Sequence, residues 1–212
     1  MEKDISNKSI WFGKIISVQP RIRLLRSFDQ RSHSYLGYSL SLIGNINGEE
    51  REFSIGIGPI AQEKHNFKVG DEVSGESLEV SDAKREPVEF YKTSNLEVAK
   101  SSHPISGFPP WQNVPVDLED YRERGHRRLS ARTFDSHCKS CKWGCRMPVE
   151  MIIDQWNPSM KRHRFETYCY GPKSCKYYKA GPQRIVPGRK GMTWEEPDWI
   201  DEENTEHRSE EE

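Results

Sequence analysis

Residues 36–57 have the sequence LGYSLSLIGNINGEEREFSIGI, and this stretch predicts the fold of the N-terminal half. Apolar residues alternate with polar or small ones on both sides of Asn47-Gly48, a pair that favours the tight turn of a β-hairpin. A period of two places successive side chains on opposite faces of a strand. The stretch therefore predicts two antiparallel strands joined at Asn47-Gly48.

The flanking segments extend this pattern. Residues 10–18 (IWFGKIISV) are β-branched and aromatic, and we expect this strand to stop at Pro20, which has no N–H for a ladder. Residues 60–67 are expected to form one or two helical turns, and further strands are expected at 73–80 and 87–98. Five strands with a short helix between the third and fourth resemble the OB-fold, a partly open Greek-key barrel, over residues 9–99.

The segment between the first two strands is expected to be a loop rich in arginine. In an OB-fold, such a loop lies beside the face that binds oligonucleotides, so the resemblance implies a nucleic-acid role for three of its residues. These are Arg21, Arg23 and Arg26. The alternative is that they cover a solvated loop, because the acidic residues of the same half cancel their charge.

Five cysteines lie close together in the C-terminal half and indicate a metal site. The spacing Cys138-x2-Cys141, then Cys169-x5-Cys175, lets two pairs of thiolates face one ion, and zinc is the metal that such sets usually bind. We predict zinc on Cys138, Cys141, Cys169 and Cys175. Cys145, His137 or His163 are alternative ligands, and an iron–sulfur cluster is the alternative cofactor, since Cys138, Cys141 and Cys145 form a tight run.

Two short strands, 149–154 and 164–168, are expected between the cysteine pairs, around a turn at 156–158. A hairpin with a metal at one end resembles a zinc ribbon in layout. The expected architecture is therefore mainly β: a five-stranded OB-like barrel (1–100), a proline-rich linker (101–120), a basic, metal-stabilised β-hairpin module (121–190) and an irregular, acidic C-terminal tail (191–212). We expect the tail to be solvated and disordered after Asn204.

The net charge of −1 conceals a strong asymmetry along the chain. Residues 121–190 carry 17 Lys or Arg against 5 Asp or Glu, whereas residues 191–212 carry 1 against 10. A basic block with interleaved aromatic residues is typical of a nucleic-acid surface. The candidate contact residues of this block are Arg122, Arg124, Arg127, Arg128, Arg132, Lys161, Arg162 and Arg164.

Other function classes receive little support from the 212 residues. Phosphate-binding glycine loops, dinucleotide-binding glycine motifs and the metalloprotease and serine-hydrolase motifs are all missing, and no catalytic residue is assigned. No window of the sequence is apolar enough to span a membrane, and the first ten residues have no apolar signal core. We therefore expect a cytoplasmic protein that binds DNA or RNA, with a single strand as one candidate ligand.

Two alternative functions remain open. The first is a protein–protein assembly subunit with a structural metal, whose acidic tail docks on a protein partner. The second is an iron–sulfur protein with a redox or enzymatic role.

Overall fold

The computed structural model describes residues 8–27, 30–103 and 107–209, and strands dominate it, which confirms the prediction of a mainly β chain. Helices are few and short. The strands are β1 (Ser9–Arg26), β2 (Arg31–Ile46), β3 (Glu49–Ile57), β4 (Glu72–Glu79), β5 (Phe90–Lys100), β6 (Arg127–Arg128), β7 (Gly144–Ile152), β8 (Lys161–Cys169), β9 (Arg184–Pro187) and β10 (Thr193–Glu196). The helices are α1 (Pro59–His65), α2 (Leu118–Arg124), α3 (Ala131–Thr133) and α4 (Trp199–Glu203), with a π-helical turn at Phe134–Cys138 and a 3-10 turn at Arg189–Gly191.

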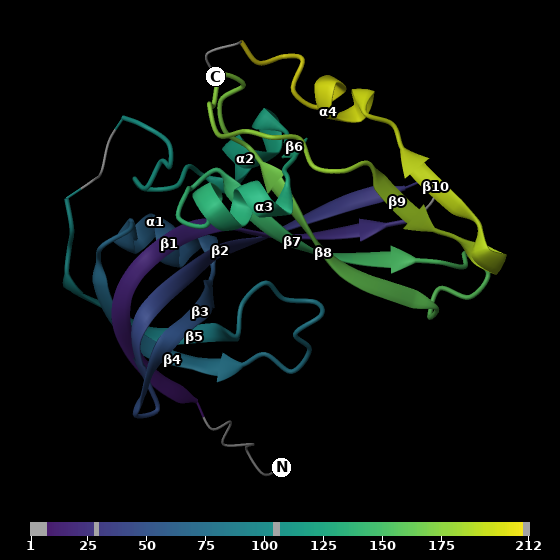
Figure 1. Cartoon of the computed structure of the whole chain (residues 1–212). Helices are drawn as coiled ribbons and strands as arrows, with labels where there is room; N and C mark the ends of the chain where they lie inside the picture. Colours follow the sequence, from purple (N-terminus) through teal and green to yellow (C-terminus); the bar gives the residue numbers. More distant parts are fainter. Residues whose placement is uncertain (1–7, 28–29, 104–106, 210–212) are drawn as a thin grey trace, which may run out of the picture.

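Eight strands form one sheet in the order β2-β3-β5-β4-β1-β7-β8-β6. Because β1 also pairs with β2, the first five strands partly close into a ring (Figure 1). The predicted hairpin turn is present, and both of its central residues have the positive φ that such a turn requires: 53° at Asn47 and 91° at Gly48. Alternate side chains of the ring strands are buried in its core, among them Trp11, Leu40 and Phe53.

The first hairpin is longer than the sequence predicts. Pro20 lies within β1, opposite Tyr38, and the pairing with β2 continues to Arg26 and Arg31. The strand tolerates the proline because the register shifts directly after it, between Arg21 and Ile22, and ladder hydrogen bonds are interrupted at such a bulge. The expected arginine loop is therefore largely strand, and Arg21, Arg23 and Arg26 lie in β1.

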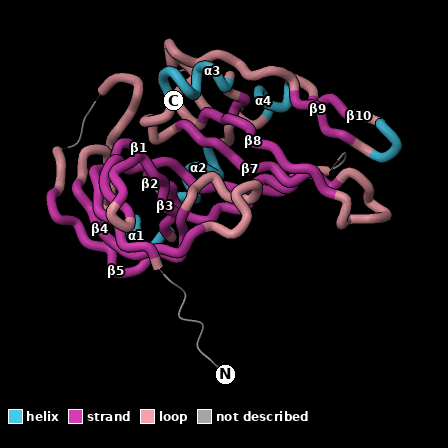
Figure 2. Tube along the Cα trace, turned by 60° about the horizontal axis from the view of Figure 1, so that its bottom comes forward, coloured by secondary structure: helices cyan, strands magenta, loops and turns pink. Residues whose placement is uncertain are grey.

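The C-terminal half continues the same sheet. The predicted hairpin is formed by β7 and β8, and residues Leu24–Arg26 of β1 pair in parallel with Val149–Met151 of β7. Figure 2 shows β1 and β2 running out of the ring to lie beside β7 and β8. One hydrophobic core extends from Trp11 in the ring to Tyr168 in β8, so the two halves are joined by packing as well as by pairing.

The C-terminal segment is ordered over most of its length. Strands β9 and β10 pair with each other, α4 follows, and Thr205 and Arg208 are buried. The Arg208 guanidinium donates hydrogen bonds of 3.0 Å to the carbonyls of Tyr170 and Gly171. The expectation of a solvated tail after Asn204 is therefore wrong up to Arg208, and residues 210–212 lie outside the described part.

Within the described ranges, no helix is both long and apolar enough to cross a membrane.

Candidate functional site

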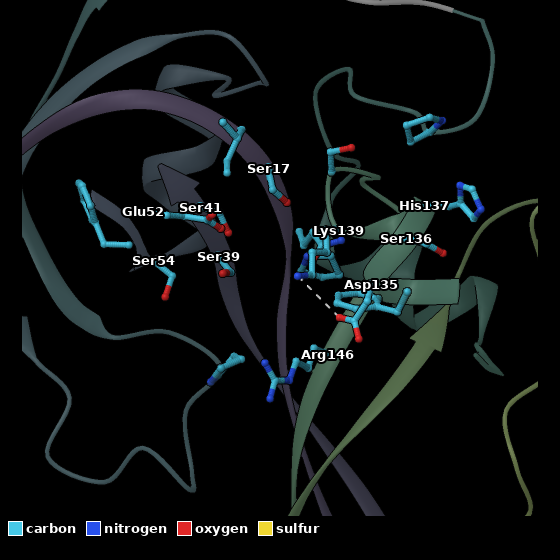
Figure 3. Close-up of a pocket in the computed structure, with 18 of the residues that line it drawn as sticks. Ser17, Ser39, Ser41, Glu52, Ser54, Asp135, Ser136, His137, Lys139 and Arg146 are labelled. Carbon is cyan, nitrogen blue, oxygen red and sulfur yellow. Dashed lines mark ion pairs between the residues drawn. The ribbon is translucent and has the colours of Figure 1, made fainter. Parts of the chain in front are cut away.

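A groove of about 620 Å³ lies between the first three strands and the turn that carries the first cysteines (Figure 3). Its floor is the face of the sheet that points away from the ring core. The register places Ser17 beside Ser41 and Ser41 beside Ser54, so a row of hydroxyls crosses β1, β2 and β3. Gln19 of β1 lies opposite Ser39 of β2 and adds a second polar pair beside this row. The floor can therefore form hydrogen bonds with a polar ligand.

The opposite wall of the groove carries a flat ring pair. His137, at the end of the π-helical turn, stacks on Tyr177 with ring centroids 4.3 Å apart and an interplanar angle of 2°. Both residues line the groove, and the His137 side chain is exposed. Such a platform offers an aromatic face to a planar ligand.

Positive charge reaches the groove from two residues. Lys139 is exposed and lies 3.7 Å from Asp135, the ion pair drawn in Figure 3. Arg146 is exposed, and its guanidinium lies over the Phe165 ring at 4.4 Å. Glu52 and Glu89 line the groove near β3, so the electrostatic character of the lining is mixed.

The cysteine cluster adjoins the groove. Cys138 and Cys141 flank a tight turn in which the Cys141 N–H donates to the Cys138 carbonyl at 3.1 Å. Cys169 lies opposite Gly144 in the β7–β8 register. Cys138 and Cys169 pack in one small core with Leu129 and Phe134.

The thiols of the predicted quartet influence one another. Burial raises the pKa of Cys138 to about 12, with further increases from Cys169, Cys141 and Cys175. Burial likewise raises the pKa of Cys141 to about 11, and Cys169 and Cys175 add to the effect. The pKa of Cys169 is raised by burial and by Cys175. All four predicted ligands therefore lie within electrostatic reach of one another.

Backbone groups near two of these sulfurs oppose the effect of burial. The Gly171 N–H donates to Cys169 Sγ at 3.4 Å. Burial raises the pKa of Cys141, and the backbone of Trp143 and Trp111 partly offsets this increase. N–H donors stabilise a thiolate, the form of cysteine that binds metals. Nevertheless, in the described part of the chain no group of three or more His, Cys, Asp or Glu side chains is arranged as a metal site.

The alternative ligands lie in other surroundings. Cys145 is fully buried, and its Sγ is 3.4 Å from the Pro20 carbonyl, as expected for a protonated thiol that donates. Burial raises the pKa of Cys145, in keeping with a neutral thiol. His163 Nε2 lies 3.3 Å from a carboxylate oxygen of Glu150, and His137 stacks on Tyr177. These three residues therefore lie in surroundings that differ from those of the predicted quartet, and the choice of metal ligands stays a prediction.

Most of the predicted nucleic-acid contacts form internal pairs. Arg21 and Arg23 both pair with the buried Glu86, which follows β4, and Arg122 pairs with Glu119. The remaining paired residues are Arg26 (with Glu166 and Glu196), Arg128 (with Asp198 and Asp201), Lys161 (with Glu150) and Arg164 (with Glu166).

Four predicted contacts have other environments. Arg124 lies over the Trp143 ring and donates to the Tyr170 carbonyl, and Arg127 lies over the Tyr178 ring and donates to the Pro172 carbonyl. Arg132 and Arg162 are exposed, with no side-chain ion pair among the described residues. Seven of the eleven predicted contacts are therefore paired with acids of the same chain, and their role in binding nucleic acid stays a prediction.

Sequence reasoning did not identify the groove residues. The hydroxyl row had a detectable signal, because serines alternate with leucines at Ser39 and Ser41, which places them on one face of a strand. The stacked pair had none, since His137 and Tyr177 are 40 positions apart in the sequence.

No protein-family model matches this chain, and neither does any curated protein or solved structure.

Proposed function

We propose that this protein binds single-stranded nucleic acid in the groove beside β1, β2 and β3. The supporting observation is the position of the groove on the ring. We take the ring for an OB-fold barrel, because the closed order β1-β2-β3-β5-β4, with α1 between β3 and β4, matches the resemblance over residues 9–99. OB-folds bind oligonucleotides on the face of their second and third strands. The groove lies on that face.

The lining suits a single strand better than a duplex. A base stacks on an aromatic face only when it is free of its own neighbours. The His137–Tyr177 platform provides such a face, and the serine row provides donors and acceptors for base edges or sugar hydroxyls. Lys139 and Arg146 lie apart from Glu52 in the groove (Figure 3), and their positive charges would attract phosphates.

Direct binding to labelled single-stranded DNA and RNA tests this proposal. We expect Lys139→Gln and Arg146→Gln each to weaken binding and to reduce the slope of log K against log salt by about 0.7. Tyr177→Ala should cost about 1–3 kcal/mol of binding free energy through lost stacking. Lys64→Gln is the matched control, because Lys64 is exposed on α1 and does not line the groove.

Two results would contradict this function. If the wild-type protein binds neither nucleic acid at low salt, the groove has another ligand, and the role of an assembly subunit becomes the better hypothesis. If it binds but the groove variants match the Lys64→Gln control, the nucleic acid occupies a different surface.

A structural zinc ion is part of the same proposal. The ligands would be Cys138, Cys141, Cys169 and Cys175, and the amide donors at Cys141 and Cys169 support this choice because they favour thiolates. The ion would hold the π-helical turn, and with it His137 and Lys139, against the β7–β8 hairpin. Metal analysis of protein purified without oxygen should find one zinc per chain, whereas iron with visible absorption would favour the cluster.

A further inference from the structure

The C-terminal segment 193–208 crosses the ends of β1, β2 and β6 and places carboxylates on their arginines. In Figure 1 this segment, with β10 and α4, runs along the far side of the sheet from the ring. Arginine side chains from three separate strands meet it. The contacts are ion pairs between carboxylates of the segment and guanidinium groups of the strands.

The Arg128 contact is the most complete. The backbone N–H and the Nε of Arg128 donate to Asp201 Oδ2 at 3.1 and 2.8 Å, and Nη2 donates to Asp198 Oδ1 at 2.5 Å. The Arg128 side chain is 6% exposed. Two carboxylates on one guanidinium fork occupy the donors that would otherwise hold phosphate oxygens.

Glu196 makes the equivalent contact at the tip of the first hairpin. Its two oxygens lie 3.2 Å from Arg26 Nη2 and 3.0 Å from Arg31 Nη1. Arg31 also donates to Asn204 Oδ1 at 3.1 Å. One carboxylate thus bridges two guanidinium groups, as a single phosphate can.

Two open hollows border the segment. One of about 370 Å³ lies between the segment and the β1–β2 tip, and another of about 950 Å³ lies between α4 and Arg127. Trp199 lines both hollows and remains 57% exposed. Charge, more than apolar burial, therefore holds this part of the segment in place.

We propose that Arg26, Arg31 and Arg128 form a second binding surface, for the phosphates of a nucleic-acid strand, and that Glu196, Asp198 and Asp201 occupy it in place of phosphates. This inference rests on the proposed nucleic-acid function. Displacement of the segment exchanges three carboxylates for phosphates on the same guanidinium groups. The free protein is therefore inhibited at this surface by its own chain.

Substitution of the three acids by their amides tests the inference. Glu196→Gln, Asp198→Asn and Asp201→Asn, combined, remove three charges while they keep the shape of each side chain. The matched control combines Glu202→Gln, Glu203→Gln and Glu206→Gln, which removes three charges from exposed residues of the same segment. Both proteins are titrated against labelled single-stranded DNA and RNA at two salt concentrations.

We expect the first variant to bind more tightly than both wild type and control, with a salt slope steeper by about 2, from three contacts of about 0.7 each. An equal gain in the control would mean that overall charge is the cause, and would overturn the inference. No gain in either, while the groove variants still weaken binding, would overturn it and leave the proposed function standing. Failure of every protein to bind would overturn both.

A single substitution covers the case in which the triple variant does not fold. Glu196→Gln leaves Arg26 paired with Glu166, so the buried guanidinium keeps a carboxylate partner. We expect a smaller gain in affinity from Arg31 alone. Unchanged affinity in this folded variant would overturn the proposed role of Glu196.

Discussion

The half-buried His33 and the buried His126, which pack together, should make the stability of this protein depend on pH. His33, in β2, packs against His126 with ring centroids 4.9 Å apart. Burial, together with the charges of Arg31 and Arg26, lowers the pKa of His33 from 6.5 to about 4. Burial also lowers the pKa of His126. Both rings are therefore neutral in the folded protein at neutral pH.

The size of the effect of His33 follows from linkage. Because the unfolded chain binds this proton more readily than the folded one, the contribution to stability is complete above about pH 6.5 and is lost as the pH falls towards 4. A shift from 6.5 to about 4 corresponds to about 3 kcal/mol in total, of which about 2 kcal/mol is lost by pH 5.

Denaturant unfolding of wild type and His33→Phe at several pH values measures this contribution. Phenylalanine keeps a planar ring but does not titrate, so the free energy of unfolding of the variant should fall by about 2 kcal/mol less than that of wild type between pH 7 and pH 5. His103→Phe is the control, because His103 is exposed. Parallel pH curves for wild type and His33→Phe would refute the reasoning.

Other substitutions should have distinct effects. Cys141→Ser should abolish metal binding and protease resistance of the C-terminal half, whereas Cys145→Ser should retain the metal. Equal loss of the bound metal in both variants would favour an iron–sulfur cluster. Gly125→Ala should loosen the C-terminal segment, because the φ of Gly125 is 65° and a Cβ there would lie 2.1 Å from the Asn204 carbonyl oxygen. Hydrogen exchange should then be faster in this segment, and unchanged protection of its amides would contradict the prediction. Leu40→Ala should lower the free energy of unfolding by about 2–5 kcal/mol, because Leu40 is fully buried and its removal leaves a cavity. A smaller loss in denaturant unfolding would mean that the ring core collapses into that cavity.

Local pattern was sufficient for much of the fold. The period of two around Asn47-Gly48 predicted the β2–β3 hairpin, and two short strand-like stretches around the turn at 156–158 predicted the β7–β8 hairpin. The extension of β1 past Pro20 was missed, although Ile22 and Leu24 continue the alternation. The arginines that alternate with Ile22 and Leu24 suggested an exposed loop. The carboxylate that pairs with Arg21 and Arg23 belongs to Glu86, which is far along the chain, so nothing in the local sequence indicated it.

The same distance in sequence limits prediction of the site. Spacing alone selected Cys138 together with three cysteines that raise the pKa of its thiol, and their binding of a metal stays a prediction. The arginines were chosen for local charge, but the acids that pair with Arg26 and Arg128 are about 70 or more positions away. The groove depends on three strands and a distant tyrosine, so only the folded chain defines it.

The shared strand β1 has a consequence for how the chain is made. Leu24 pairs with Val149, so at ~5–20 residues per second a ribosome supplies the partner strand about 6–25 s after Leu24. During that time, one edge of the growing hairpin presents unpaired N–H and C=O groups that other chains can recruit. Arg21 and Arg23 alternate with the apolar Ile22 and Leu24 along this stretch, and we expect their charges to disfavour pairing with a second copy. Arginines that form ion pairs in the finished protein would then also limit aggregation of the nascent chain.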